Sequence, residues 1–190
     1  MFAGPNGAGK STGYSKATIE ESGRTFWIIN PDILSAQISR VESRSPLDAN
    51  LEAVRRIETW LTASVAAYQT IGVETVLSTD KYRALVTEAK RRGFEFKLVY
   101  VLLRTPELHI ERVRRRVKDG GHDVPVDRII GRRARSLAQL PWFLEQADVA
   151  LIYDNSGATP RLNAEKRNGE IFLERRALPE IRAAVESAAT

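Results

Sequence analysis

The chain of 190 residues contains no cysteine. Disulfide bonds, thiolate metal sites and a cysteine nucleophile are therefore excluded. The sequence also has no run that approaches the roughly 18 apolar residues of a membrane-spanning helix, and no signal-peptide pattern precedes its first glycine. We therefore expect a cytoplasmic protein with no membrane partner.

The composition is otherwise that of an ordinary globular protein, with 43% hydrophobic and 28% charged residues. The length predicts a single domain over residues 1–190. The net charge of +5 suits either nucleic acid or substrates that carry several phosphates. Many of the arginines gather in one segment, as Arg112, Arg114, Arg115, Arg116, Arg128, Arg132, Arg133 and Arg135. Because this cluster is local and lacks an aromatic stacking platform, we rank a small molecule above nucleic acid as the partner.

Residues 4–12 are the most informative segment, because they match the pattern G-x-x-x-x-G-K-[ST] of a loop that wraps nucleotide phosphates. Glycines let backbone N–H groups approach phosphate oxygens, and the helix that follows points its positive end at them. The Lys10 ammonium suits the β- and γ-phosphates, and the Ser11 hydroxyl suits Mg²⁺. The alternative is a glycine-rich turn that only caps a helix. The residues expected to contact the nucleotide are Gly4, Asn6, Gly7, Ala8, Gly9, Lys10, Ser11 and Thr12.

Strands and helices are expected to alternate along the chain. Short apolar runs predict strands at residues 26–29, 73–77, 94–103 and 149–153. Helical spacing and proline or glycine boundaries predict helices at 11–21, 31–40, 46–71, 80–92, 106–119, 126–139 and 181–189. Asn168-Gly169 predicts a hairpin. Such alternation indicates a mainly parallel sheet covered by helices on both faces.

Ligands of such sheets bind at the carboxyl ends of the strands, so that edge holds the candidate chemistry. Asp32 follows a strand by two residues, where a carboxylate can accept a proton from an attacking hydroxyl or hold Mg²⁺ through water. It also suits the first turn of a helix, where it would favour the dipole. Glu74 and Thr75 lie in an otherwise apolar strand. Because burying an unpaired carboxylate is costly, Glu74 is expected to meet either a ligand, a partner or an arginine.

The segment 104–135 has the features of a lid. Arg112 and Arg116 lie four residues apart on one helical side, while the core side is apolar. Arginines on a closing lid can neutralise charge on a transferred phosphoryl group; the alternative is a solvated basic face. In an ATP-driven motor, Asp154 would be the Mg²⁺ ligand, but Asn155 stands where the catalytic glutamate of such a motor would follow. These two residues fit better as a wall for the nucleotide base.

Several segments together closely resemble the zeta toxin-like P-loop kinases. They are residues 4–12, Asn30-Pro31-Asp32, residues 74–78, residues 120–125 and residues 153–156, and the resemblance extends from residue 4 to about 163. It implies an α/β P-loop NTPase fold, a three-layer sandwich with a mainly parallel sheet and a helical lid over about 105–140. It also implies transfer of a phosphoryl group from ATP, with Mg²⁺, to a hydroxyl of a small molecule. In characterised zeta toxins the acceptor is UDP-N-acetylglucosamine.

The resemblance assigns roles by position. Asp32 would be the base that activates the acceptor hydroxyl, in a pocket with Glu74 and Thr75. Arg116 and Arg132 would be the lid arginines that act with Lys10 on the phosphates, and Arg112 and Arg135 are the nearest alternatives. Arg112, Asp154 and Asn155 are expected to contact the nucleotide. An antitoxin is a candidate partner. Relatives usually carry tyrosine where this chain has Arg133, so we expect altered lid closure or nucleotide contacts there.

Two other functions stay open at this stage. One is a kinase for the 5′-hydroxyl of nucleic acid, which the positive charge favours. The other is a nucleotide-binding module with impaired catalysis, because only Met1-Phe2-Ala3 precedes Gly4 and the central strand is expected to be short.

Overall fold

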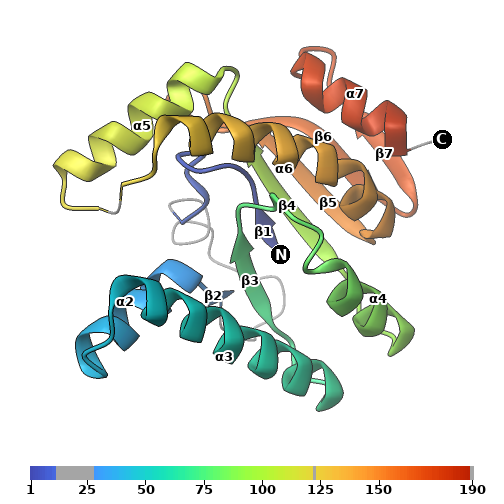
Figure 1. Cartoon of the computed structure of the whole chain (residues 1–190). Helices are drawn as coiled ribbons and strands as arrows, with labels where there is room; N and C mark the ends of the chain where they lie inside the picture. The colour runs from blue at the N-terminus through green and yellow to red at the C-terminus, as the bar shows by residue number, and fades with distance from the viewer. Residues whose placement is uncertain (12–27, 122, 189–190) are drawn as a thin grey trace. The chain divides into compact units, whose positions relative to one another are not determined.

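The computed structural model describes residues 1–11, 28–121 and 123–188. The chain divides into two compact units (Figure 1). Unit 1 comprises residues 1–17 and 76–190, and unit 2 comprises residues 18–75. The expected helix at 11–21 lies outside the described residues beyond Ser11, as do residues 26 and 27 of the first expected strand. The predicted fold class is confirmed: the strands are mainly parallel and flanked by helices.

Unit 1 is built on a sheet in the order β1-β4-β5-β6-β7. Strands β1, β4 and β5 pair in parallel, whereas the pairs β5–β6 and β6–β7 are antiparallel. The strands are β1 (Phe2–Ala3), β4 (Lys97–Leu102), β5 (Val149–Asp154), β6 (Arg161–Arg167) and β7 (Glu170–Leu173). Tyr100 of β4 and Ile152 of β5 are fully buried at the centre of this sheet. A parallel strand covered on both faces reads as a continuous apolar run, which is why β4 and β5 were recognisable in the sequence.

The hairpin expected at Asn168-Gly169 is confirmed between β6 and β7. Both residues have positive φ, at 52° and 81°. A two-residue turn with that handedness matches the twist of the strands it joins.

Four helices of unit 1 are described: α4 (Arg83–Arg91), α5 (Pro106–Lys118), α6 (Val126–Gln146) and α7 (Pro179–Ala188). Helix α6 contacts α4, α5 and α7 (Figure 1). The expected end of α6 at Gln139 is wrong, because the helix continues through Pro141 to Gln146. Proline inside a helix costs about 3 kcal/mol. Full burial of Leu140, Phe143 and Leu144 offsets that cost, at roughly 1.5–3 kcal/mol for each such side chain.

Unit 2 contains a parallel strand pair and two packed helices. The strands are β2 (Ile28–Ile29) and β3 (Gly72–Thr75), and the helices are α2 (Pro31–Val41) and α3 (Pro46–Ala66). Ile38 of α2 packs with Ala49 and Ala53 of α3, joined by the partly buried Leu34. Alanine has a small side chain, so these positions let the two helices approach closely.

The helix predicted over residues 46–71 is too long. Helix α3 ends at Ala66, and Tyr68 beyond it has φ of 55° and is 68% exposed. Leu51 is 61% exposed. The buried face instead consists of Ala49, Ala53, Ile57, Leu61, Ser64 and Val65. Small side chains thus form the first part of this face, and the larger Ile57, Leu61 and Val65 form the rest.

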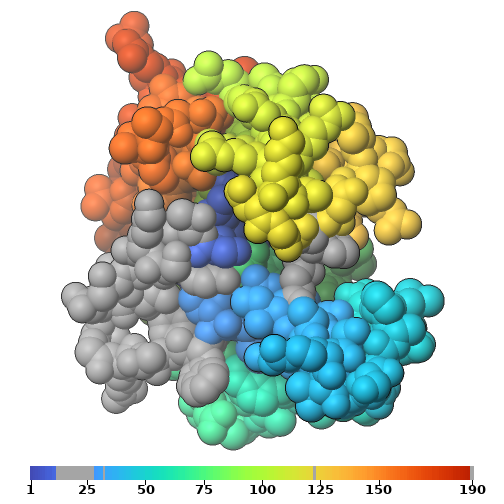
Figure 2. All heavy atoms as spheres, turned by 90° about the vertical axis from the view of Figure 1, so that its left-hand side faces the viewer, coloured from blue at the N-terminus to red at the C-terminus, as the bar shows by residue number. Residues whose placement is uncertain are grey.

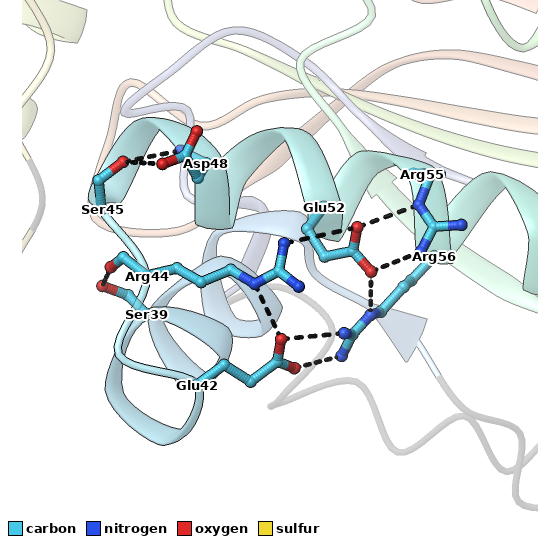
Figure 3. Close-up of polar contacts among 8 residues, drawn as sticks. All are labelled: Ser39, Glu42, Arg44, Ser45, Asp48, Glu52, Arg55 and Arg56. Atoms are coloured by element: carbon cyan, nitrogen blue, oxygen red, sulfur yellow. Dashed lines mark hydrogen bonds and ion pairs between the residues drawn. The ribbon is translucent and has the colours of Figure 1, made fainter.

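The outer side of α2 and α3 carries a network of ion pairs (Figure 3). The Arg56 guanidinium donates to Glu42 and to Glu52, at 2.6 Å in each case. Arg55 donates to Glu52 at 2.7 Å, and Arg44 lies 3.0 Å from a Glu42 oxygen. Figure 2 shows this side of the helices, coloured blue to cyan, at the surface. Such exposed pairs gain little because water screens them.

Among the helices within the described ranges, none combines the length and apolar character that crossing a membrane requires.

Candidate nucleotide-binding site

Strand β1 leads directly into the loop at Gly4, and the loop packs tightly on β4. Gly4 has φ of 139°, and a Cβ on it would lie 2.1 Å from the Val101 carbonyl oxygen. Gly7 has φ of 74°, and its Cβ would lie 2.7 Å from the His109 carbonyl oxygen. Any larger residue would clash with backbone at both positions. The glycines therefore allow the loop to lie against β4 and α5, and they fix where it runs.

The Lys10 side chain lies against the backbone of its own loop. Its ammonium donates to the carbonyl oxygens of Gly4 at 2.8 Å and Pro5 at 3.2 Å, and the residue is 7% exposed. Lys10 and Ser11 are helical, so the loop ends in the start of a helix, with Ser11 exposed. Thr12 lies outside the described residues. A glycine-rich backbone with an ammonium beside it and a helix start behind it suits a chain of phosphates.

His109 of α5 connects the loop to the end of β4. Its side chain is completely buried. Nδ1 lies 2.7 Å from the Asn6 carbonyl oxygen, and Nε2 lies 3.3 Å from the Leu103 backbone nitrogen. Burial lowers the pKa of His109 to about 4, so the ring is neutral at physiological pH. No motif in the sequence indicated a role for His109. The only available signal was a polar residue four positions before Val113 on the core side of α5.

Arg112 and Asn155 form a second connection to the loop. The Arg112 guanidinium donates to the Asn155 carbonyl oxygen at 2.6 Å. The Asn155 side-chain amide donates to the Ala8 carbonyl oxygen at 2.8 Å. A Cβ on Gly9 would lie 2.5 Å from that same amide nitrogen. Two residues predicted to contact the nucleotide are thus brought together beside the loop.

The two arginines predicted to act on the phosphates occupy different surroundings. Arg132 of α6 donates to the Asn6 side-chain oxygen at 3.3 Å, and so reaches the loop. Arg116 of α5 packs against Gly121, since a Cβ there would lie 2.6 Å from Arg116 Cγ. The backbone nitrogen of Gly121 also donates to the Arg116 carbonyl oxygen at 2.9 Å. The turn after α5 therefore folds back over the Arg116 side chain.

Asp154 has partners of its own at the end of β5. Its carboxylate accepts hydrogen bonds from the backbone and hydroxyl of Ser156 and pairs with Arg161 at 3.2 Å. The residue is 4% exposed. The neighbouring Asn155, by contrast, is the one that reaches the loop. The geometry thus makes Asp154 the residue that shapes this turn.

Arg133 is buried between elements of unit 1. Its guanidinium donates to the carbonyl oxygens of Leu103 and Arg104 and pairs with Glu180 of α7 at 2.8 Å. These contacts join α6 to the end of β4 and to α7. The charge that replaces the expected tyrosine is therefore neutralised inside the unit.

The predicted acceptor residues lie in unit 2. The parallel register pairs Ile28 with Gly72 and Ile29 with Val73, which brings Asn30 opposite Glu74. The Asn30 side-chain amide donates to the Glu74 carboxylate at 2.8 Å. Its oxygen accepts from the Ile33 backbone at 3.4 Å and so helps to begin α2. One partner of Glu74 is thus the amide of Asn30.

Asp32 is the second residue of α2, and Thr75 is the last residue of β3. The side chain of Asp32 lies outside the part of the chain that the structure describes. Asp32 follows β2, as expected, whereas Thr75 ends β3 because this strand stops two residues before its expected end at residue 77.

Comparison with known proteins assigns the fold. The family model described as the AAA domain matches residues 1–141. An uncharacterized protein of Haemophilus influenzae is 26% identical over 129 residues, covering 67% of this chain and 86% of the relative.

Two sets of solved structures share the fold. The AvrRxo1-ORF1:AvrRxo1-ORF2 complex with sulphate ions has a TM-score of 0.72 at 17% identity, and the same complex with ATP has 0.70 at 16%. They cover 100% and 98% of this chain, which spans 64% and 62% of theirs. The PezAT chromosomal toxin–antitoxin system of Streptococcus pneumoniae has a TM-score of 0.59 at 15% identity, covering 98% of this chain and 83% of that chain. At these identities the similarity shows the shared fold alone.

Proposed function

The chain belongs to the AAA domain family, and we propose that it transfers the γ-phosphoryl group of ATP to a hydroxyl of a small molecule. The observation that carries this proposal is the loop of unit 1. It is lined by backbone, holds Lys10 against its carbonyl groups, and is contacted by Arg132 and through Asn155 by Arg112. Two arginines and one lysine on a phosphate-binding loop suit the charge of a triphosphate.

In this proposal, unit 1 binds the nucleotide. The backbone of residues 4–9 and Lys10 hold the β- and γ-phosphates, and Ser11 and Thr12 contribute hydroxyl groups. Bound Mg²⁺, held by Ser11, would supply positive charge that offsets the phosphate oxygens. Arg116 and Arg132 neutralise charge on the transferred group. Arg112, Asp154 and Asn155 border the nucleotide, Asp154 by holding the turn that carries Asn155.

Unit 2 binds the acceptor, with Glu74 and Thr75 in its pocket. The Asp32 carboxylate takes the proton of the acceptor hydroxyl. The hydroxyl oxygen then bonds to the γ-phosphorus, and the bond from that phosphorus to the bridging oxygen breaks, so that ADP leaves with the electron pair. Asn30 supports this role, because it both begins α2 ahead of Asp32 and binds Glu74.

UDP-N-acetylglucosamine is the first acceptor to test, because of the resemblance to zeta toxins. The similarity to the PezAT toxin–antitoxin system and to the AvrRxo1-ORF1:AvrRxo1-ORF2 complex supports an antitoxin as partner. Because the chain spans only 64% of the matched AvrRxo1 chain, activity and partners are proposals for this protein.

The test is mass spectrometry of the acceptor after incubation with the protein, Mg²⁺ and ATP. The acceptor panel comprises UDP-N-acetylglucosamine, other hydroxyl metabolites and a 5′-hydroxyl oligonucleotide. Asp32→Asn removes the base at similar size, and Asp48→Asn is the matched control at an exposed position of α3. We expect one metabolite to gain a phosphoryl group with the wild type and with Asp48→Asn, and not with Asp32→Asn. Phosphate found on the oligonucleotide alone would show that the acceptor is a nucleic acid and not a small molecule. Full transfer by Asp32→Asn would show that Asp32 is not the base.

A further inference from the structure

The strongest unassigned feature of the molecule is the contact between His109 and the phosphate-binding loop. His109 is fully buried and has a different backbone partner at each ring nitrogen. One partner, the Asn6 carbonyl oxygen, lies within the loop, and the other, the Leu103 nitrogen, lies at the end of β4. Nothing in the G-x-x-x-x-G-K-[ST] pattern requires a histidine at this place in the fold.

The partners determine the form of the ring. The Asn6 carbonyl only accepts and the Leu103 N–H only donates, so Nδ1 carries the hydrogen and Nε2 accepts. A neutral ring satisfies both bonds, whereas a charged ring would leave the Leu103 N–H facing another N–H. The charged neighbours Lys10 and Arg133 also disfavour a positive charge on the ring. His109 is therefore held as a neutral donor toward the loop.

This donor fixes the orientation of one peptide group. The peptide between Asn6 and Gly7 is planar and trans, so its C=O and N–H point in opposite directions. When the Asn6 oxygen is held on the His109 side, the Gly7 N–H points to the other side of the loop, away from that ring. Gly7 also has φ of 74°, a conformation in which successive backbone N–H groups form an anion-binding concavity.

We propose that His109 is a positioning residue that orients the Asn6–Gly7 peptide, so that the Gly7 N–H faces the phosphates. This inference rests on the proposed function for its ligand, a nucleoside triphosphate. His109 itself contacts neither phosphate nor acceptor. It acts through the loop backbone, and through the Leu103 bond it holds the loop against the end of β4.

Two near-isosteric substitutions of His109 distinguish the roles of its two ring nitrogens. His109→Asn places an amide N–H near the position of Nδ1 and so keeps the donor to Asn6. His109→Gln places an amide oxygen near the position of Nε2 and so keeps the acceptor for Leu103 while losing the donor. A role in packing alone predicts the same nucleotide affinity for both variants.

The experiment measures the ATP affinity and melting temperature of the wild type and both variants. We expect His109→Asn to bind ATP within about threefold of the wild type and His109→Gln to bind at least tenfold more weakly, although both are destabilised. Tenfold corresponds to about 1.4 kcal/mol, the scale of one hydrogen bond. Equal affinities in the two variants, or weaker binding by His109→Asn, would overturn the inference.

A second measurement does not depend on nucleotide. In ¹H–¹⁵N spectra, the Gly7 amide of His109→Asn should keep the wild-type shift, and that of His109→Gln should move. The imidazole of the wild type should show hydrogen on Nδ1, and hydrogen on Nε2 would overturn the inference even if neither variant folds. If the wild type and both variants fold but none of them binds ATP, the proposed function is contradicted. The Gly7 amide shift and the imidazole signals would then still test the role of His109.

Discussion

The loop of unit 1 and the outer side of α2 and α3 in unit 2 use polar side chains in opposite ways. Around the loop, Lys10, His109 and Asn155 bond to backbone carbonyl groups, and Lys10 and His109 are buried while Asn155 is partly buried. On the outer side of α2 and α3, Glu52 and Arg56 bond to each other's side chains at the surface. A buried bond that is lost leaves its partner unsatisfied, whereas an exposed one is replaced by water. Single substitutions should therefore matter at the loop and hardly at all in the surface network.

The largest expected effect is at Gly4. Gly4→Ala should destabilise the protein by more than about 3 kcal/mol, because the new Cβ would lie 2.1 Å from the Val101 carbonyl oxygen in addition to the strain of a positive φ. Gly93→Ala is the control, since Gly93 also has positive φ but nothing within 4 Å of its Cβ. Gly93→Ala should lower the free energy of unfolding, measured in urea, by only about 1–2 kcal/mol. Equal losses of stability in Gly4→Ala and Gly93→Ala would show that the loop does not pack tightly on β4.

The next effect is the pH dependence of stability that His109 contributes. The pKa of His109 lies at about 4 in the folded chain and near 6.5 when unfolded. The unfolded chain therefore takes up the proton first as pH falls, and stability is lost between pH 6.5 and 4. The loss amounts to about 3 kcal/mol, at about 1.4 kcal/mol for each unit. Above pH 6.5 the contribution is fully present.

Urea unfolding at several pH values checks this prediction. His109→Asn should flatten the decline relative to the wild type, whereas groups common to both proteins cancel in the difference. If the free energy of unfolding falls equally with pH in the two proteins, the His109 ring is not held neutral in the fold.

A smaller effect is expected at Arg112. Arg112→Ala should weaken ATP binding by roughly tenfold, because it removes a charge-assisted bond to Asn155, whose amide in turn binds Ala8 of the loop. Arg114→Ala, at an exposed position of the same helix, is the matched control and should bind ATP within about twofold. If both substitutions weaken binding equally, the effect comes from net charge and the contact through Asn155 is irrelevant.

The smallest effect is expected in the surface network. Glu52→Gln removes the carboxylate whose pKa the hydrogen bonds from Arg55 and Arg56 lower to about 2. Because Arg55 and Arg56 then face water, the melting temperature should change less than for Gly93→Ala, and ATP affinity should stay the same. A drop in affinity at Glu52 would contradict the contrast between the two regions.

The sequence predicted the parts of the molecule that depend on local patterns. The β6–β7 hairpin followed from Asn168-Gly169, and β4 and β5 followed from apolar runs. The loop was recognisable because its glycines and lysine have fixed spacing. Arg132 was expected near the phosphates from the family resemblance. Asn155 was expected near the nucleotide because ligands of such sheets bind at the ends of the strands.

Other features depend on contacts that no local pattern encodes. Helix α6 passes Pro141 because Leu140 before it and Phe143 and Leu144 beyond it are fully buried and hold the helix in place. The role of His109 depends on backbone atoms of Asn6 and Leu103, and the sequence does not show which backbone atoms a side chain contacts. The neutralisation of Arg133 by Glu180 was not foreseen either, because these two side chains lie far apart in the sequence and meet only in the fold.

The most direct test of the account is an isothermal titration of ATP with Mg²⁺ into the wild type and Lys10→Ala. We predict saturable binding of one nucleotide per wild-type chain, and affinity at least about 100-fold weaker for Lys10→Ala if its ammonium meets the β- and γ-phosphates. Equal binding by the two proteins, or no binding by the wild type, would contradict the assignment of this loop as the nucleotide site.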